Sequence, residues 1–155
     1  VGFVLQPVLV KLTVLWEKQK NQAFLKYCFL MHLAALGISL VILLGGAFLG
    51  CPVLSIVFGV NLNSYSAVLD VLLIGGGFFA LAVIDQVILT IMRHQYAMLW
   101  GFGLASLFAT VLSPVLVKSM GLMGAALAYT CSDAILFLIF LLFIVFYYRK
   151  ERCSL

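Results

Sequence analysis

Charged residues are scarce in this sequence. Of its 155 residues, 9 are Lys or Arg and 5 are Asp or Glu, so 9% are charged, whereas a soluble domain carries about 25%. Hydrophobic residues make up 66% of the chain, and the mean hydropathy is +1.27. A domain this small has too little interior to bury so much apolar surface. The composition therefore excludes a soluble globular protein and indicates that lipid is the solvent.

Motifs for catalysis and metal binding are also missing. The sequence has no HExxH, no GxSxG and no Ser/His/Asp set with credible spacing. Three glycines at 75–77 follow no predicted strand and precede no Lys, so they do not form a phosphate loop. The cysteines show no metal-ligand spacing and are expected to be free thiols: Cys28, Cys51, Cys131 and Cys153. We expect no enzymatic activity, no bound metal and no cofactor.

Long apolar runs predict the fold. About 20 apolar residues in a helix span the hydrocarbon core of a membrane. Backbone groups in lipid must pair internally, and no strand-like alternation competes, so the runs predict helices. We expect an all-α, polytopic transmembrane bundle of one truncated and four full helices, at about 1–16, 24–48, 66–92, 96–117 and 122–148.

One connection is long enough to be a loop of its own. The stretch GCPVLSIVFGVNLNSYS at 50–66 contains Pro52, Gly59, Asn61 and Asn63, which are typical of loops. We expect it to be a loop with a short interfacial turn. The chain opens on Val1 inside an apolar run, which we interpret as the C-terminal part of a longer protein whose N-terminal lobe is missing here.

The cations predict the orientation in the membrane. Alternating helices place the loops at 16–22 and 93–95 and the tail from 149 on one side. Counting residues near the helix ends, that side holds eight Lys or Arg residues and the other side holds only Lys118. Because Lys and Arg accumulate on the cytoplasmic side, the C-terminus is predicted to be cytoplasmic. Since the cations lie at the ends of apolar runs, the net charge of +4 does not indicate a nucleic-acid partner.

Two carboxylates lie deep within the predicted helices. A charge at the centre of a membrane helix costs about 2.5–3.5 kcal/mol. Asp85 lies about 10 Å inside its helix end by helical rise, with Gln86 beside it, and Asp133 lies close to the middle of the last helix. Intramembrane carboxylates usually face a cavity or a partner, so both a functional and a structural role stay open for each.

Two other polar residues complete the set. Arg93, at a helix end, is mainly a topology anchor and is also a local cation for an anionic cargo. His32, with Ser39 on the same helix, is interpreted as a hydrogen-bonded packing residue rather than a proton carrier. The candidate substrate-path or ion-binding residues are therefore Asp85, Gln86, Asp133 and Arg93.

Small residues recur at helical spacing and predict helix-packing faces. One stripe on the 66–92 helix, flanked by Asp85, is expected to face protein or water, while the Leu, Ile and Val faces meet lipid. This stripe consists of Gly75, Phe79, Ala82, Gln86, Thr90 and Arg93. The next helix carries a second stripe, Gly103, Ser106, Thr110 and Ser113. The last helix carries a third, Gly124, Ala128 and Ser132.

The order of these features resembles the C-terminal part of the multidrug/oligosaccharidyl-lipid/polysaccharide exporter superfamily, and within it the polysaccharide-biosynthesis flippases. The resemblance covers nearly the whole chain and depends on the order and spacing of five stretches: VLQPVLVKL, WEKQKNQAFLKY, LSIVFGVNLNSYSAVLDVLLIGGGF, ILTIMRHQ and LSPVLVKSMGLMGAALAY. The resemblance implies two lobes around a central cavity that works by alternating access, in a bacterial cytoplasmic membrane. It also implies a polyprenyl-diphosphate-linked oligosaccharide repeat unit as cargo, moved across the membrane for surface polysaccharide synthesis.

Two other functions remain open at this point. A cation-coupled multidrug exporter of the same superfamily would bind Na⁺ or H⁺ at Asp85 or Asp133. A non-transporting membrane subunit would instead hold its carboxylates paired with fixed cations and closed to water. The expected partners are membrane lipid, the lipid-linked oligosaccharide and a coupling cation.

Overall fold

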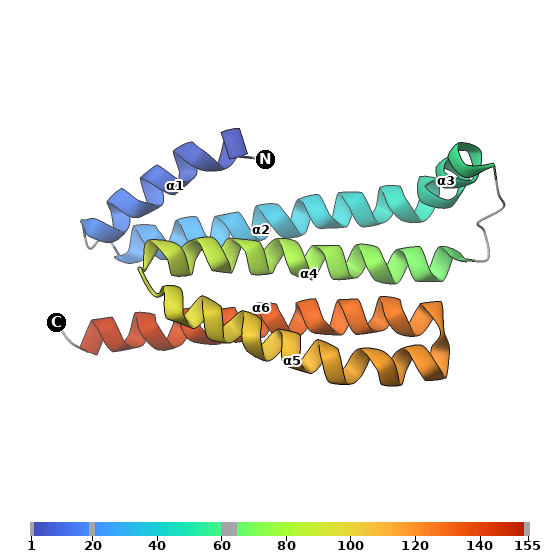
Figure 1. Ribbon diagram of the computed structural model, residues 1–155. Helices are drawn as coiled ribbons and strands as arrows, with labels where there is room; N and C mark the ends of the chain where they lie inside the picture. The colour runs from blue at the N-terminus through green and yellow to red at the C-terminus, as the bar shows by residue number, and fades with distance from the viewer. Residues whose placement is uncertain (1, 19–20, 60–64, 154–155) are drawn as a thin grey trace.

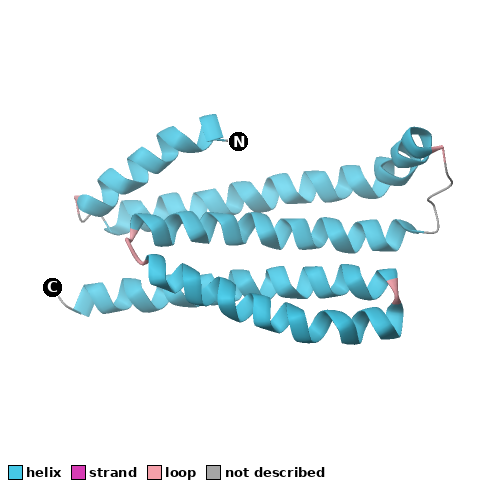
Figure 2. Ribbon diagram, viewed as in Figure 1, coloured by secondary structure: helices cyan, strands magenta, loops and turns pink. Residues whose placement is uncertain are grey.

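The structure, a computed structural model, describes residues 2–18, 21–59 and 65–153, and within these ranges every regular element is a helix (Figure 1, Figure 2). The elements are α1 (Gly2–Glu17), α2 (Asn21–Gly45), the π-helical turn η1 (Gly46–Gly50), α3 (Cys51–Phe58), α4 (Ser66–Ile91), α5 (Gln95–Met120) and α6 (Leu122–Cys153). The predicted all-α bundle is confirmed.

Four helical stretches are long and apolar enough to cross a membrane: Gln22–Phe58, Ser66–Ile91, Gln95–Met120 and Leu122–Lys150. Each is an unbroken helical path, so its backbone groups are hydrogen-bonded within the segment, as the hydrocarbon core requires. The chain is therefore a multi-pass membrane protein.

The helices run up and down beside one another (Figure 1). The α1–α2 connection, the α4–α5 turn and the C-terminus lie at one end of the bundle, and α3 and the α5–α6 turn lie at the other. This is the alternation on which the charge prediction depends. In the middle of the bundle α4 contacts α2 and α6, and α5 packs against α6.

The predicted loop at 50–66 is wrong in its first half. The chain continues from α2 through the π-helical turn into α3, which ends at Phe58 with Gly59 in the left-handed region at φ 66°. Pro52 lies at the start of α3, directly after the π-helical turn, and the helical path continues through it. Asn61 and Asn63 lie outside the described residues.

Two predicted helices end earlier in the sequence prediction than in the structure. The helix predicted at 96–117 runs through Pro114 to Met120 as α5, and the helix predicted at 122–148 extends to Cys153 as α6. The turn between them is tight because Gly121 has φ 57°. At Gly124 a Cβ would collide with the backbone carbonyl of Leu116, so only glycine allows this close approach.

The packing face of α5 differs from the predicted stripe. Ala97, Gly101 and Ala105, spaced four residues apart, are buried, and a Cβ on Gly101 would collide with the ring of Phe140 on α6. The predicted stripe is instead exposed at Gly103, Ser106 and Thr110, with Ser113 half-buried. Both stripes carry small residues at helical spacing, and only tertiary contact distinguishes them.

The stripe predicted on α4 is correct in part. Gly75 and Ala82 are buried as expected, but Phe79, Thr90 and Arg93 are exposed. Apolar residues that were expected to meet lipid are buried instead: Leu81, Ile88, Leu89 and Ile91. Because α4 contacts helices on two sides, more of its circumference is buried than one stripe provides. On α6 the predicted packing residues Gly124 and Ala128 are buried, and Ser132 is half-buried.

Candidate functional site

A polar contact joins α2 to α4 inside the membrane-spanning region. His32 Nε2 lies 2.9 Å from Asp85 Oδ1. Asp85 is only 1% exposed, and it is the buried charged side chain of the described core. An ionisable group so deep in a membrane helix is costly unless it is paired, and here the partner is an imidazole on the neighbouring helix.

The local structure fixes the imidazole in place. His32 Nδ1 lies 2.9 Å from the carbonyl oxygen of Cys28, one turn earlier on α2. The ring of Phe137 on α6 lies 6.3 Å from the His32 ring and 6.4 Å from the Phe78 ring of α4. Residues from three helices therefore surround the pair, and the Phe137 ring lies beside His32 on the α6 side.

One oxygen of the Asp85 carboxylate has no hydrogen-bond partner in the part of the chain that the structure describes. This atom, Oδ2, is buried. A buried oxygen without a partner costs about 1–3 kcal/mol. The carboxylate therefore keeps one acceptor position that a proton, a water molecule or a cargo group could use.

Asp133 forms a second, weaker polar site on α6. Its side chain is half-buried and interacts with Tyr129 one turn earlier, and its Oδ2 atom has no hydrogen-bond partner in the described part of the chain. Asp133 and Phe137 are four residues apart and so lie on the same side of α6. Asp133 is therefore on the face of α6 that carries the ring beside His32.

The other two candidates make no hydrogen bond to the His32–Asp85 pair that is seen in the described part of the chain. Gln86 is half-buried, and its backbone carbonyl accepts a hydrogen bond from the Thr90 hydroxyl at 2.8 Å. Arg93 is exposed in the α4–α5 turn and is the non-glycine residue with positive φ, at 60°. The polar partner of Asp85 among the described residues is therefore His32, rather than Gln86 or Arg93.

Sequence reasoning did not find the role of His32. The predicted hydrogen bonding is confirmed, but one bond crosses to another helix, and its partner there is the most deeply buried carboxyl group of the described residues. One signal could have pointed to it. His32 and Asp85 both lie within about three turns of helix ends on the same predicted side, so their depths match.

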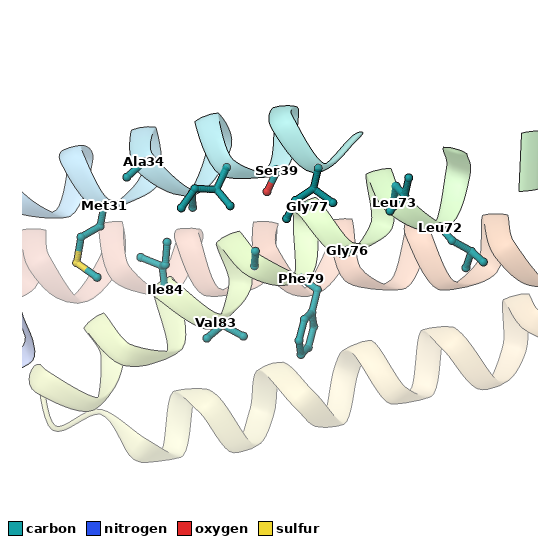
Figure 3. Close-up of a pocket in the computed structure, with 14 residues that line it drawn as sticks. Met31, Ala34, Ser39, Leu72, Leu73, Gly76, Gly77, Phe79, Val83 and Ile84 are labelled. Atoms are coloured by element: carbon teal, nitrogen blue, oxygen red, sulfur yellow. The ribbon is translucent and has the colours of Figure 1, made fainter. Parts of the chain in front are cut away.

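An apolar groove follows the outer side of the α2–α4 contact (Figure 3). Its volume is about 760 Å³, and Ser39 is the only polar side chain among its lining residues. The walls come from α2 and α4 alone, including Ala35, Gly76 and Val83. On α2 the lining runs from Met31 to Ile42, so the groove follows the helix for about 16 Å.

The chemistry available to these residues is proton and cargo binding. In the ranges that the structure describes, no three His, Cys, Asp or Glu side chains come together as a metal site. An imidazole hydrogen-bonded to a carboxylate can instead hold and pass a proton. The groove offers apolar surface to a hydrocarbon chain.

Comparisons with known proteins add no family. No protein-family model matches the sequence, and neither a curated protein nor a solved structure matches it at a significant level. The functional conclusion therefore depends on the geometry of the groove and of the His32–Asp85 pair.

Proposed function

We propose that this chain is part of a membrane transporter, a flippase that moves a polyprenyl-diphosphate-linked oligosaccharide repeat unit between the leaflets of a bacterial cytoplasmic membrane. The observation that carries the proposal is the apolar groove along α2 and α4. A flippase must keep the hydrocarbon tail of its cargo in an apolar environment while the polar head group crosses. The proposed activity is transport by alternating access rather than catalysis.

The dimensions of the groove fit a hydrocarbon tail. It extends for about half the thickness of a hydrocarbon core of about 30 Å. Its lining residues are small or aliphatic over most of its length. Gly76 and Gly77 have no side chains and therefore leave space on the α4 side of the groove (Figure 3). Small residues there leave room that a chain of methylene or isoprene units can fill.

The cations support an anionic head group. Lys26 and Arg93 are exposed at the end of the bundle where α4 meets α5. In the proposed orientation this end is cytoplasmic and so is the C-terminus, which is where a diphosphate-linked cargo is made available. A diphosphate is attracted to Lys and Arg at short range, so these cations suit its first binding step.

The test is a flipping assay on the full-length protein with a fluorescent lipid-linked oligosaccharide. Gly76→Leu fills the groove, because a Cβ at Gly76 has no neighbour within 4 Å. We expect at least a tenfold loss of flipping with normal protein abundance. Gly103→Leu is the matched control, since a Cβ there also has no neighbour within 4 Å and the residue is outside the groove. Equal rates in the two variants would contradict the proposal.

A cation-coupled drug exporter is the second candidate, and the His32–Asp85 pair favours it. Drug efflux that depends on an ion gradient and is lost in Asp85→Asn would establish it. Cysteine labelling at positions 85 and 133 tests both transport functions. Protection of both positions throughout would indicate a subunit that only packs against a partner, because a transporter must open to water on each side in turn.

A further inference from the structure

The hydrogen bonds of His32 determine where its hydrogens are. Nδ1 lies 2.9 Å from the Cys28 carbonyl oxygen, and a carbonyl can only accept. Nδ1 must therefore carry a hydrogen. A neutral imidazole has a single N–H, so in the neutral form Nε2 presents a lone pair to Asp85.

The bond from His32 to Asp85 then needs one more proton. Nε2 lies 2.9 Å from Asp85 Oδ1. Either a protonated carboxyl donates to the neutral ring, or a protonated ring donates to the carboxylate. Both descriptions place the same single proton between Nε2 and Oδ1. When that proton leaves and Nδ1 keeps its hydrogen on the Cys28 carbonyl, a lone pair faces a carboxylate and the hydrogen bond is lost.

We propose that His32 and Asp85 form a binding site for one proton, and that its occupancy controls how closely α2 is held to α4. Release sends H⁺ to water and leaves a neutral imidazole beside a carboxylate, so the charge of the site changes from zero to minus one. The hydrogen bond that joins the two helices is lost in the same step. The surface beside it is the apolar groove, which supplies no replacement bond.

The surroundings favour a proton over a metal cation. Both imidazole nitrogens are already engaged, so the ring has no lone pair left for a metal in the proton-loaded state. Within the described ranges there is no cluster of three His, Cys, Asp or Glu side chains. Asp85 Oδ2, buried and without a described hydrogen-bond partner, is a second position on the carboxylate that can take up or release the proton.

Other titratable groups face the pair from the neighbouring helices. On α2 the nearest is the Cys28 thiol, and on α4 the sequence from 71 to 92 has no second charged residue. From α6, Asp133 and Tyr129 lie beyond Phe137 on one side, and Tyr148 packs beside the cluster of Cys28 and Ile88 on the other. From α1, Lys11 lies over the Tyr27 ring. The experiment must therefore distinguish the pair from these groups.

The proposal deepens the proposed function by naming the coupling ion. The role of the proton in transport rests on the proposed function, whereas the binding of the proton does not. Binding itself can be measured without cargo. Loss of flipping with proton binding intact would overturn the transport function alone. A site that binds no proton in a protein that still flips cargo would overturn this inference alone.

The first measurement is ¹⁵N NMR of histidine-labelled, full-length protein in nanodiscs over a pH series. A His94→Gln background removes the second histidine of this chain, and remaining signals are assigned by comparison with His32→Gln. We expect the Nδ1 signal of His32 to stay protonated throughout and the Nε2 signal to change with pH. A His32 Nδ1 without a hydrogen, or an Nε2 signal that never changes, would overturn the proposal.

The second measurement is the distance between α2 and α4. Spin labels at Leu36→Cys and Ile74→Cys, both exposed positions, report it in a background without native cysteines. The Cys28 contact survives that background because it is made by the backbone carbonyl. We expect the distance to increase as the Nε2 signal changes, with one shared midpoint.

The matched control is the double variant His32→Gln with Asp85→Asn. A side-chain amide can donate to the other amide, so the helices keep a neutral hydrogen bond that has no proton to lose. We expect the short distance at every pH. Asp133→Asn should leave the transition unchanged. A transition that persists in the double variant, or that disappears in Asp133→Asn, would assign the proton to another group and overturn the proposal.

Discussion

The two sides of α4 are built differently. Toward α6, Gly75 lies so close to its neighbour that an added Cβ would be 2.8 Å from Tyr129 and Thr130, and the Thr130 hydroxyl donates to the Val71 carbonyl at 2.9 Å. Toward α2, the helices leave a groove of about 760 Å³, and an added Cβ on Gly76 has no neighbour within 4 Å. Adjacent glycines on one helix thus serve opposite purposes.

The difference indicates which helices move together. With little apolar driving force between helices in lipid, close backbone contact and interhelical hydrogen bonds decide how firmly two helices are joined. By these two criteria α4, α5 and α6 form one closely packed unit. The helix α2 is attached to this unit by the His32–Asp85 hydrogen bond, beside the open groove. The proposed transport function would use such a difference, because a conformational change is concentrated where packing is weakest.

The largest effect is expected from removing the hydrogen bond between His32 on α2 and Asp85 on α4. His32→Ala leaves Asp85 buried with no described partner on either oxygen, which should lower the free energy of unfolding by about 3–5 kcal/mol. Ser39→Ala, also on α2, should change it by less than about 0.5 kcal/mol. Reversible unfolding in bicelles measures both. Equal losses would mean that the pair does not hold α2 in place.

Substitutions of the adjacent Gly75 and Gly76 compare the closely packed side of α4, which faces α6, with the open side, which faces the groove. Gly75→Ala forces a methyl group against Tyr129 and Thr130 and should cost about 1–3 kcal/mol. Gly76→Ala meets no neighbour within 4 Å and should gain up to about 1 kcal/mol from helix propensity. The readout is again the free energy of unfolding. The comparison fails if the two substitutions have effects of the same sign and size.

The α4–α5 turn should be improved by substitution. Arg93 N–H donates to the Thr90 carbonyl and His94 N–H to the Leu89 carbonyl, with Arg93 at φ 60°, a helix ending that usually has glycine at this position. Arg93→Gly should therefore stabilise the fold by about 1 kcal/mol. Arg93→Ala keeps the strained backbone and should show no gain. A gain in both variants would assign the effect to the lost charge.

The smallest effect is expected at Thr130. Thr130→Val removes the hydrogen bond to the Val71 carbonyl on α4 and should cost about 0.6 kcal/mol, the average for such bonds in membranes. Thr110→Val is the control, because the Thr110 hydroxyl bonds only within α5, to the Ser106 carbonyl at 2.8 Å. Cross-linking between α4 and α6 provides a second readout. A larger loss at Thr110 would contradict the assignment of Thr130 to the closely packed side of α4.

The sequence was sufficient to predict which segments span the membrane, but it was insufficient to predict which residues make the contacts between the helices. Run length predicts a membrane helix because lipid forces the backbone to pair within the segment. Apolar pattern does not separate lipid from core, since both are equally apolar, so Leu81, Ile88 and Leu89 could not be identified as buried. For the same reason the small residues of α5 predicted the wrong packing face.

For the candidate site, too, the sequence predicted individual residues and did not predict the contacts between helices. Depth and hydropathy identified Asp85 and Asp133, because a buried carboxylate is expensive wherever it lies. The partner of Asp85 could not be deduced from one helix, because His32 and Asp85 are 53 residues apart. Pro52 misled the loop prediction because membrane helices tolerate proline where local π-helical turns adjust the backbone, and the sequence alone did not indicate the turn at Gly46–Gly50.

The unbroken path from α2 through α3 also determines how the protein fits its bilayer. The span Gln22–Phe58 has 37 residues, which at 1.5 Å per residue is about 55 Å of helix against a hydrocarbon core of about 30 Å. In Figure 1 the chain bends away at α3, just after the π-helical turn at Gly46–Gly50. Such a mismatch is relieved by tilting or bending at a cost that changes with membrane thickness. Lipid chain length thus becomes a variable that acts on the same helix that carries His32 and one wall of the groove.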